Sequence, residues 1–222
     1  RTSNKVRGGG VLIAVHSRYP SLNINMDNSR CEEIFISMSV GKNQIIFGGV
    51  YIPPASDVNV YLDHISSLDS VRDRFPNSIV CILGDYKMPN IEWVHDNTNS
   101  PALRPIYNNS ELYNIVVDSF NYLELYQVNY ILNHNNNTLD LALSNSVNFS
   151  VQRDSYSIVP DMDRHHPPCN AKLIIPSDLC EIESPPLYKF NFKNAPYDSI
   201  NDYFGSVDWN ALLSTTDVET NF

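Results

Sequence analysis

A short apolar stretch that ends on Gly84-Asp85 constrains the fold of this chain more than any other feature. Residues 79–83 read Ile-Val-Cys-Ile-Leu, and the run stops at one glycine followed by one carboxylate. Such a run predicts a buried strand, which delivers Asp85 to the sheet edge where the functional sites of α/β folds are usually built. A carboxylate at a strand end is as typical of a turn or a helix cap, so this segment alone leaves both interpretations open.

The composition is that of a globular domain with an acidic surface. Of the 222 residues, 42% are hydrophobic and 18% are charged, which is ordinary for one main domain. The 15 basic and 25 acidic residues give a formal net charge of −10. Tight DNA binding by overall charge is therefore disfavoured, and a nucleic-acid function needs local basic contacts. Widely spaced cysteines favour a reduced, intracellular protein, and no apolar stretch is long enough to predict a membrane partner.

The spacing of apolar residues predicts an α/β sandwich of mixed sheets. We expect one helix over 57–75, capped by Asp57 or Asn59, and a second over 110–121, capped by Ser110. The first three expected strands form a meander. All strands are expected at 11–15, 34–40, 44–51, 78–85, 123–130, 138–144, 147–158 and 171–175.

The character of the chain changes after Pro176, so we expect a domain over 1–176 and a linker or tail over 177–222. Two prolines at 185–186 mark the linker, and the aromatic stretch 188–209 follows with one short helix near 198–204. Because the stretch is acidic, a docking tail is favoured over a platform for stacking nucleic-acid bases.

Four separated motifs occur in a particular order. They are Val-Tyr-Ile-Pro-Pro at 50–54, Gly-Asp-Tyr-Lys-Met-Pro-Asn-Ile-Glu-Trp at 84–93, Asn-Thr-Leu-Asp-Leu-Ala-Leu-Ser-Asn at 137–145 and Asp-Arg-His-His-Pro-Pro at 163–168. Together they resemble the blocks of the endonuclease/exonuclease/phosphatase family, and in particular the endonuclease domains of Jockey-like non-LTR retrotransposons. The resemblance implies a DNase I-like mixed two-sheet α/β sandwich, incomplete at its N-terminus, with a reverse transcriptase domain in cis in the full-length element.

The resemblance also implies an activity, namely hydrolysis of DNA phosphodiester bonds that nicks the target site for reverse transcription in the nucleus. Asp85 would orient and deprotonate the attacking water. Asp140 would hold one nitrogen of a histidine whose other nitrogen bonds the phosphate, and the Tyr51 hydroxyl would reach the same phosphate. Mg²⁺ is the implied cofactor and DNA the implied partner. Taken singly, Tyr51 is equally typical of an aromatic ring packed at a sheet end, and Asp140 of a solvated strand face.

The sequence departs from the family pattern in three places. Lys87 stands where the family usually has Asn, and an ammonium group only donates hydrogen bonds. Alignment on the prolines selects His165 as the catalytic histidine, which we prefer, whereas alignment on Asp163 selects His166. The usual metal-binding Glu and its Asn or Asp partner would lie before the first residue, which leaves Asp163 as a tentative ligand.

These departures predict a truncated copy of a retrotransposon endonuclease with impaired or no activity. The alternative is a non-catalytic remnant of the same fold that binds DNA or protein. A phosphatase of the same superfold is a less favoured third interpretation, because a fold does not fix a substrate.

Overall fold

The computed structural model describes residues 10–26, 29–95, 101–108, 110–154, 165–175 and 196–209. The chain forms two compact units, Arg1–Glu183 and Ser184–Phe222, against a division expected after residue 176. In the second unit the described residues form helix α3 (Tyr197–Ser206), close to the helix expected at 198–204. None of the described helices is long and apolar enough to cross a membrane.

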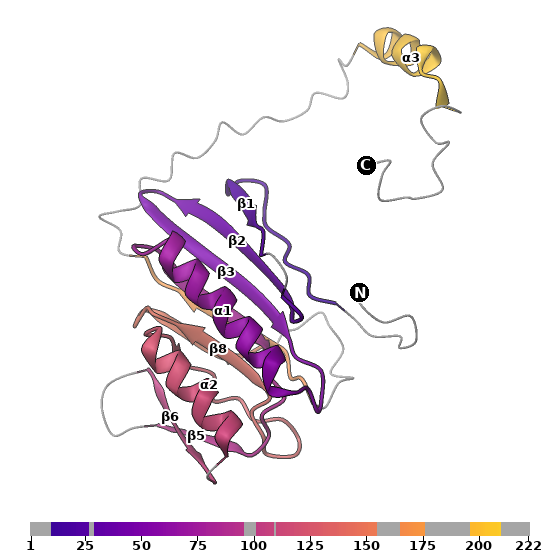
Figure 1. The fold of residues 1–222 in the computed structure, drawn as a ribbon. Coiled ribbons are helices and arrows are strands. Elements are labelled where there is room, and N and C mark those ends of the chain that lie inside the picture. The colour runs from indigo at the N-terminus through magenta and orange to yellow at the C-terminus, as the bar shows by residue number, and fades with distance from the viewer. Residues whose placement is uncertain are drawn as a thin grey trace. The chain divides into compact units, whose positions relative to one another are not determined.

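A mixed six-stranded sheet is the centre of the first unit (Figure 1). Its spatial order is β1 (Ser21–Ile24), β2 (Glu32–Val40), β3 (Asn43–Tyr51), β4 (Ile79–Asp85), β8 (Asp140–Ser144) and β7 (Tyr126–Gln127). Strands β3 and β4 pair in parallel, and the other neighbours in this sheet are antiparallel. Two further hairpins are β5 (Ile91–His95) with β6 (Leu103–Tyr107), and β9 (Phe149–Arg153) with β10 (Cys169–Leu173). The predicted mixed α/β class is confirmed.

Helices α1 (Val58–Arg74) and α2 (Glu111–Tyr122) cover one face of this sheet (Figure 1). Helix α1 starts as expected, since the Asp57 side chain accepts a hydrogen bond from the Asn59 backbone N–H at 2.7 Å. Ser110 precedes α2, but its side chain makes no capping bond, so that expectation is wrong. The helices and the sheet share one apolar core, whose members include Phe35, Ile46, Val50, Leu68, Val71, Ile82, Val116, Phe120, Leu141 and Leu143.

The opposite face of the sheet is covered in two parts. Beside β4 and β8, the hairpin β9–β10 contributes Phe149 and Val151 to a second apolar cluster with Cys81 and Ala142. Over β2 and β3 lies the segment 10–16, because a Cβ added at Gly49 would come within 2.5 Å of Val11 Cγ1.

The expected strand at 11–15, and the meander built on it, are wrong. Residues 10–16 alternate in exposure as a strand would, but they are assigned to no strand in the described part of the chain. Both edges of β2 are already paired, one with β1 and the other with β3. Alternation reports which side chains face an apolar surface, whereas strand pairing also needs a free sheet edge.

The strand expected at 123–130 shrinks to β7 because asparagine side chains replace the ladder beyond it. Asn129 Oδ1 accepts a hydrogen bond from Ile131 N at 3.0 Å, and Asn133 Oδ1 accepts bonds from the N–H groups of Asn135 and Asn137 at 2.9 and 3.1 Å. Such local bonds turn the chain and compete with strand pairing. Strands β1, β5 and β6 were not expected from the sequence.

A buried polar network joins α1 to the end of β4. The hydroxyl of Tyr86, which is fully buried, lies 2.8 Å from His64 Nε2, and His64 Nδ1 lies 2.6 Å from Glu33 Oε2. Ser67 donates to the other Glu33 oxygen at 2.6 Å, and the Tyr61 hydroxyl donates to the Tyr86 carbonyl at 2.8 Å. Burial raises the pKa of Tyr86 well above its ordinary value, so its phenol keeps its proton. The network fixes the residue that directly follows Asp85.

Replacing Tyr86 with Phe tests this network. The change leaves His64 Nε2 without its partner inside the core, which lowers the free energy of unfolding by about 1–3 kcal/mol. Urea denaturation followed by circular dichroism measures the difference. Tyr122→Phe is the matched control, because Tyr122 is 82% exposed on α2. Equal midpoints for the two variants would contradict the structural role of the network.

The glycine before Asp85 is required by a close approach of two strands. Gly84 pairs with Val50 across β3 and β4, and a Cβ added at Gly84 would lie 2.2 Å from the Val50 carbonyl oxygen. Backbone cannot move aside as the tip of a side chain can. The strands must therefore separate before any side chain fits at this position.

Gly84→Ala should destabilise the protein by about 1–3 kcal/mol, the range typical of overpacking. Thermal unfolding of the full chain measures this loss. Gly10→Ala is the control, because a Cβ at Gly10 meets nothing within 4 Å. An unchanged melting temperature for Gly84→Ala would refute the close approach.

Candidate active site

Three predicted site residues lie side by side on three neighbouring strands. Tyr51 is the register partner of Asp85, and Asp85 is the register partner of Asp140. Neighbouring strands are about 4.8 Å apart, so the three side chains form one row at one end of the sheet. They share the face opposite the helices, because Leu141 and Leu143 next to Asp140 point into the helix-side core. The sheet register alone therefore brings these residues together.

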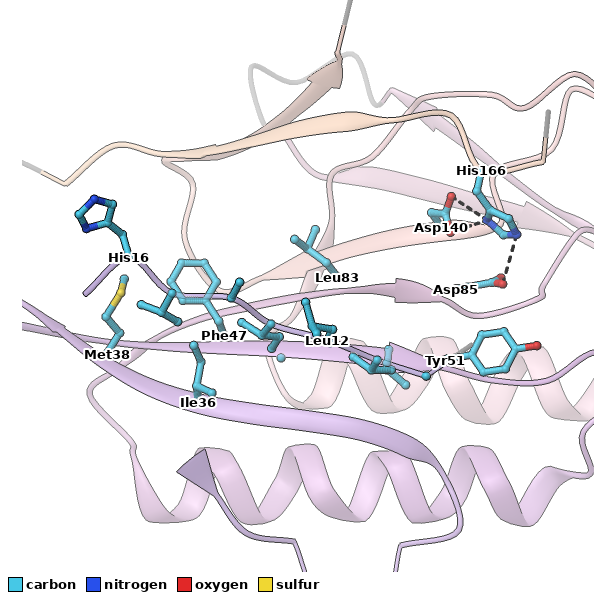
Figure 2. Close-up of a pocket in the computed structure, with 18 of the residues that line it drawn as sticks. Leu12, His16, Ile36, Met38, Phe47, Tyr51, Leu83, Asp85, Asp140 and His166 are labelled. Atoms are coloured by element: carbon cyan, nitrogen blue, oxygen red, sulfur yellow. Dashed lines mark hydrogen bonds and ion pairs between the residues drawn. The ribbon is translucent and has the colours of Figure 1, made fainter. Parts of the chain in front are cut away.

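An imidazole connects the two carboxylates of this row. His166 Nδ1 lies 2.9 and 3.1 Å from the two carboxylate oxygens of Asp140, and its Nε2 lies 3.4 Å from Asp85 Oδ2 (Figure 2). A histidine held by Asp140 was expected, but His165 was preferred for it. The structure corrects this choice, because the His165 ring packs against His134 at a centroid distance of 4.6 Å. The prolines used for the alignment do not report the direction in which each of two adjacent side chains points.

Lys87 is the fourth charged member of the cluster. Its Nζ lies 2.7 Å from Asp85 Oδ2 and 2.9 Å from His166 Nε2. The Lys87 backbone has a φ of 50°, a left-handed conformation that is uncommon for residues with a side chain. Its N–H also donates to Asp85 Oδ1 at 3.3 Å. Both oxygens of Asp85 thus accept hydrogen bonds from Lys87.

The Tyr51 ring lies at the same end of the sheet as Asp85 and His166 (Figure 2). These residues form the polar end of a cavity of about 1040 Å³ that continues along the open face of the sheet. Its remaining wall is mostly apolar and includes Leu12, Ile13, Val15, Ile36, Met38, Phe47 and Leu83. The cavity can therefore hold a charged group at one end beside a larger apolar surface.

Burial and charge act against each other at Asp140. Removal from water raises the pKa of this carboxyl above its ordinary value, and the neighbouring His166 opposes the rise. The side chains of Asp85 and Asp140 are 11% and 26% exposed. Two acids so placed need positive partners, and among the described residues these partners are Lys87 and His166.

Three of these residues also form a group that could hold a metal ion. Ligand atoms of Asp85, Asp140 and His166 all lie within 4.8 Å of one another, and carboxylate and imidazole ligands suit many divalent cations. As arranged, however, the group does not fit such an ion, because the Lys87 ammonium already contacts two of its ligand atoms. The tentative ligand Asp163 lies outside the described residues.

The sequence gave no warning of His64, Glu33 or Tyr86, which support the site from below. A signal was present in α1, where the polar residues Tyr61, His64 and Ser67 recur every three positions on the face that carries Leu68. Polar residues on the buried face of a helix need partners, and these residues find them beneath the end of β4.

Asp140→Asn tests the electrostatics of the site through pH. Because the folded protein holds the Asp140 proton more tightly than the unfolded chain does, stability falls as pH rises above the ordinary pKa of 3.8. Asparagine removes this contribution. Denaturation in the acidic range should therefore show wild-type stability falling relative to the variant as pH increases. A constant difference between the two proteins would contradict the raised pKa.

Comparison with protein-family models and with curated proteins finds no match. Two solved structures have a similar fold. One is the endonuclease domain of TRAS1, a telomere-specific non-LTR retrotransposon, with 9% identity, a TM-score of 0.48, and coverage of 72% of this chain and 71% of that one. The other is the human Nocturnin catalytic domain with bound sulfate, with 11% identity, a TM-score of 0.41, and coverage of 68% of this chain and 57% of that one.

Proposed function

We propose that this chain is a DNase I-like endonuclease domain of the retrotransposon type, which hydrolyses phosphodiester bonds of DNA. The observation that carries the proposal is the position of His166, which contacts Asp140 through one ring nitrogen and approaches Asp85 through the other. An oriented acid–imidazole pair beside a second carboxylate is suited to a reaction in which water attacks a phosphate.

Each group has one task in this reaction. Asp85 takes the proton of the water whose oxygen forms the new bond to phosphorus, while the ester bond to the leaving oxygen breaks. Asp140 fixes the His166 ring, so that Nε2 can donate to a phosphate oxygen on which negative charge develops. Tyr51 lies in the same row and supplies a second donor to that phosphate. Asp85 and His166 become available once Lys87 turns away from both.

DNA is the proposed substrate, although the chain is acidic overall. With a formal charge of −10, distant attraction to DNA is weak, and phosphate contacts depend on the site's own cations, Lys87 and His166. A reverse transcriptase domain in cis, with action in the nucleus, completes the proposed role. Such a neighbour would supply the DNA affinity that this domain lacks.

The second candidate is a non-catalytic remnant of the same fold that binds DNA or protein. The contact between Lys87 Nζ and Asp85 Oδ2 at 2.7 Å favours it, because that oxygen belongs to the proposed base. The two candidates differ in one measurable property, which is turnover.

Nicking of supercoiled plasmid by the full chain, with and without Mg²⁺, tests the proposal. Slow nicking is expected, and both Asp85→Asn and His166→Ala should reduce it by about 10²-fold or more, the usual effect of removing one preorganised group. His165→Ala is the matched control, because the His165 ring lies against His134.

Equal losses for His165→Ala and His166→Ala would refute the assignment of the histidine. DNA binding without any nicking by the wild-type chain would favour the non-catalytic remnant instead.

A further inference from the structure

Lys87 Nζ lies between two atoms that a catalytic site of this kind needs free. It is 2.7 Å from Asp85 Oδ2 and 2.9 Å from His166 Nε2. We propose that the Lys87 ammonium takes the place of a divalent cation in this site and thereby sets its affinity for such ions. This deepens the proposed function, on which its consequence for catalysis rests.

The spacing of the ligand atoms supports the position. Asp85 Oδ2 and His166 Nε2 are 3.4 Å apart. Two atoms that bind one ion at about 2.1 Å are themselves roughly 3.0–3.4 Å apart in octahedral or tetrahedral geometry. The pair therefore has the spacing of two ligands of one ion, and the ammonium nitrogen stands where that ion would contact both.

The charges of the cluster point to the same role. Asp85 and Asp140 hold two carboxylates at 11% and 26% exposure, and a cation beside them offsets their repulsion. The side chain of Lys87 is itself only 18% exposed. A divalent ion placed on the same ligands would lie against the ammonium in a poorly solvated site. The two cations therefore exclude each other.

Hydrogen-bond direction adds a further step. An ammonium can only donate, so His166 Nε2 must accept the bond from Lys87, while Nδ1 carries the proton that faces Asp140. In this arrangement Nε2 has no proton to offer a phosphate. Lys87 therefore occupies both the acceptor on Asp85 and the potential donor position on His166.

The backbone aims Lys87 into the cluster. Its φ of 50° turns the chain directly after Tyr86, which the buried network holds in place. Asn adopts the left-handed region more readily than Lys does, so Lys87→Asn keeps this turn while removing the ammonium. Lys87→Met keeps most of the length of the side chain without its charge.

Calorimetric titration of the full chain with MnCl₂ tests the inference without measuring hydrolysis. Lys87→Asn and Lys87→Met should bind Mn²⁺ about tenfold or more tightly than wild type, because a cation no longer opposes the ion. Lys87→Arg keeps a cation and should bind as weakly as wild type. Lys42→Met is the matched control, since it removes one positive charge from the exposed turn between β2 and β3. Circular dichroism verifies that each variant is folded.

Two results would overturn the inference, namely wild type binding Mn²⁺ as tightly as Lys87→Met, or no binding by any Lys87 variant. Adding Asp85→Asn to Lys87→Asn should abolish the gain, and a gain that survives would place the ion elsewhere and also overturn it. The same proteins in the plasmid assay separate the two proposals. Tighter Mn²⁺ binding without nicking by any variant supports the exchange of cations and counts against the endonuclease.

Discussion

The register shared by β3, β4 and β8 is the constraint on which the rest of the structure depends. It aligns Tyr51, Asp85 and Asp140 across three strands. Because side chains alternate along a strand, a slip of β8 by one residue would turn Asp140 into the helix-side core and bring Leu141 to the site. The apolar surface of Leu141 and Leu143 opposes that slip, so the core that stabilises the sheet also positions the acid.

The end of β4 is fixed from both sides of Asp85. Before it, Gly84 permits a backbone approach to Val50 that no other residue allows. After it, Tyr86 is held through its hydroxyl by His64, and its N–H donates to the Leu139 carbonyl at 3.0 Å, one residue before Asp140. Asp85 thus stands on a rigid base. The group that can change position with the least disturbance is the side chain of Lys87, whose ammonium is held only by the cluster.

Sequence periodicity predicted what depends on local pattern. Strands β2, β3, β4 and β8, both helices on the sheet and the burial of Cys81 follow from alternation, helical spacing and a capping aspartate. The failures involve information held elsewhere in the chain. Residues 10–16 have a strand's pattern but no free edge beside β2, and the choice between His165 and His166 depends on the direction of one side chain after a turn. No local pattern reports that Lys87 reaches His166.

The placement of Lys87 opposes stability to chemistry. Two acids in a poorly solvated row need a positive charge in the folded protein, and an acidic chain that lacks a bound ion must supply that charge from a side chain. A lysine meets this need permanently, whereas a metal ion does so only when it is bound. The same ammonium then accompanies the proposed base and accepts no proton from water. A substitution that stabilises the empty site would therefore slow the reaction, as stabilising changes in active sites commonly do. If the domain evolved under weak selection for cleavage, the stable ion pair is the arrangement that would persist.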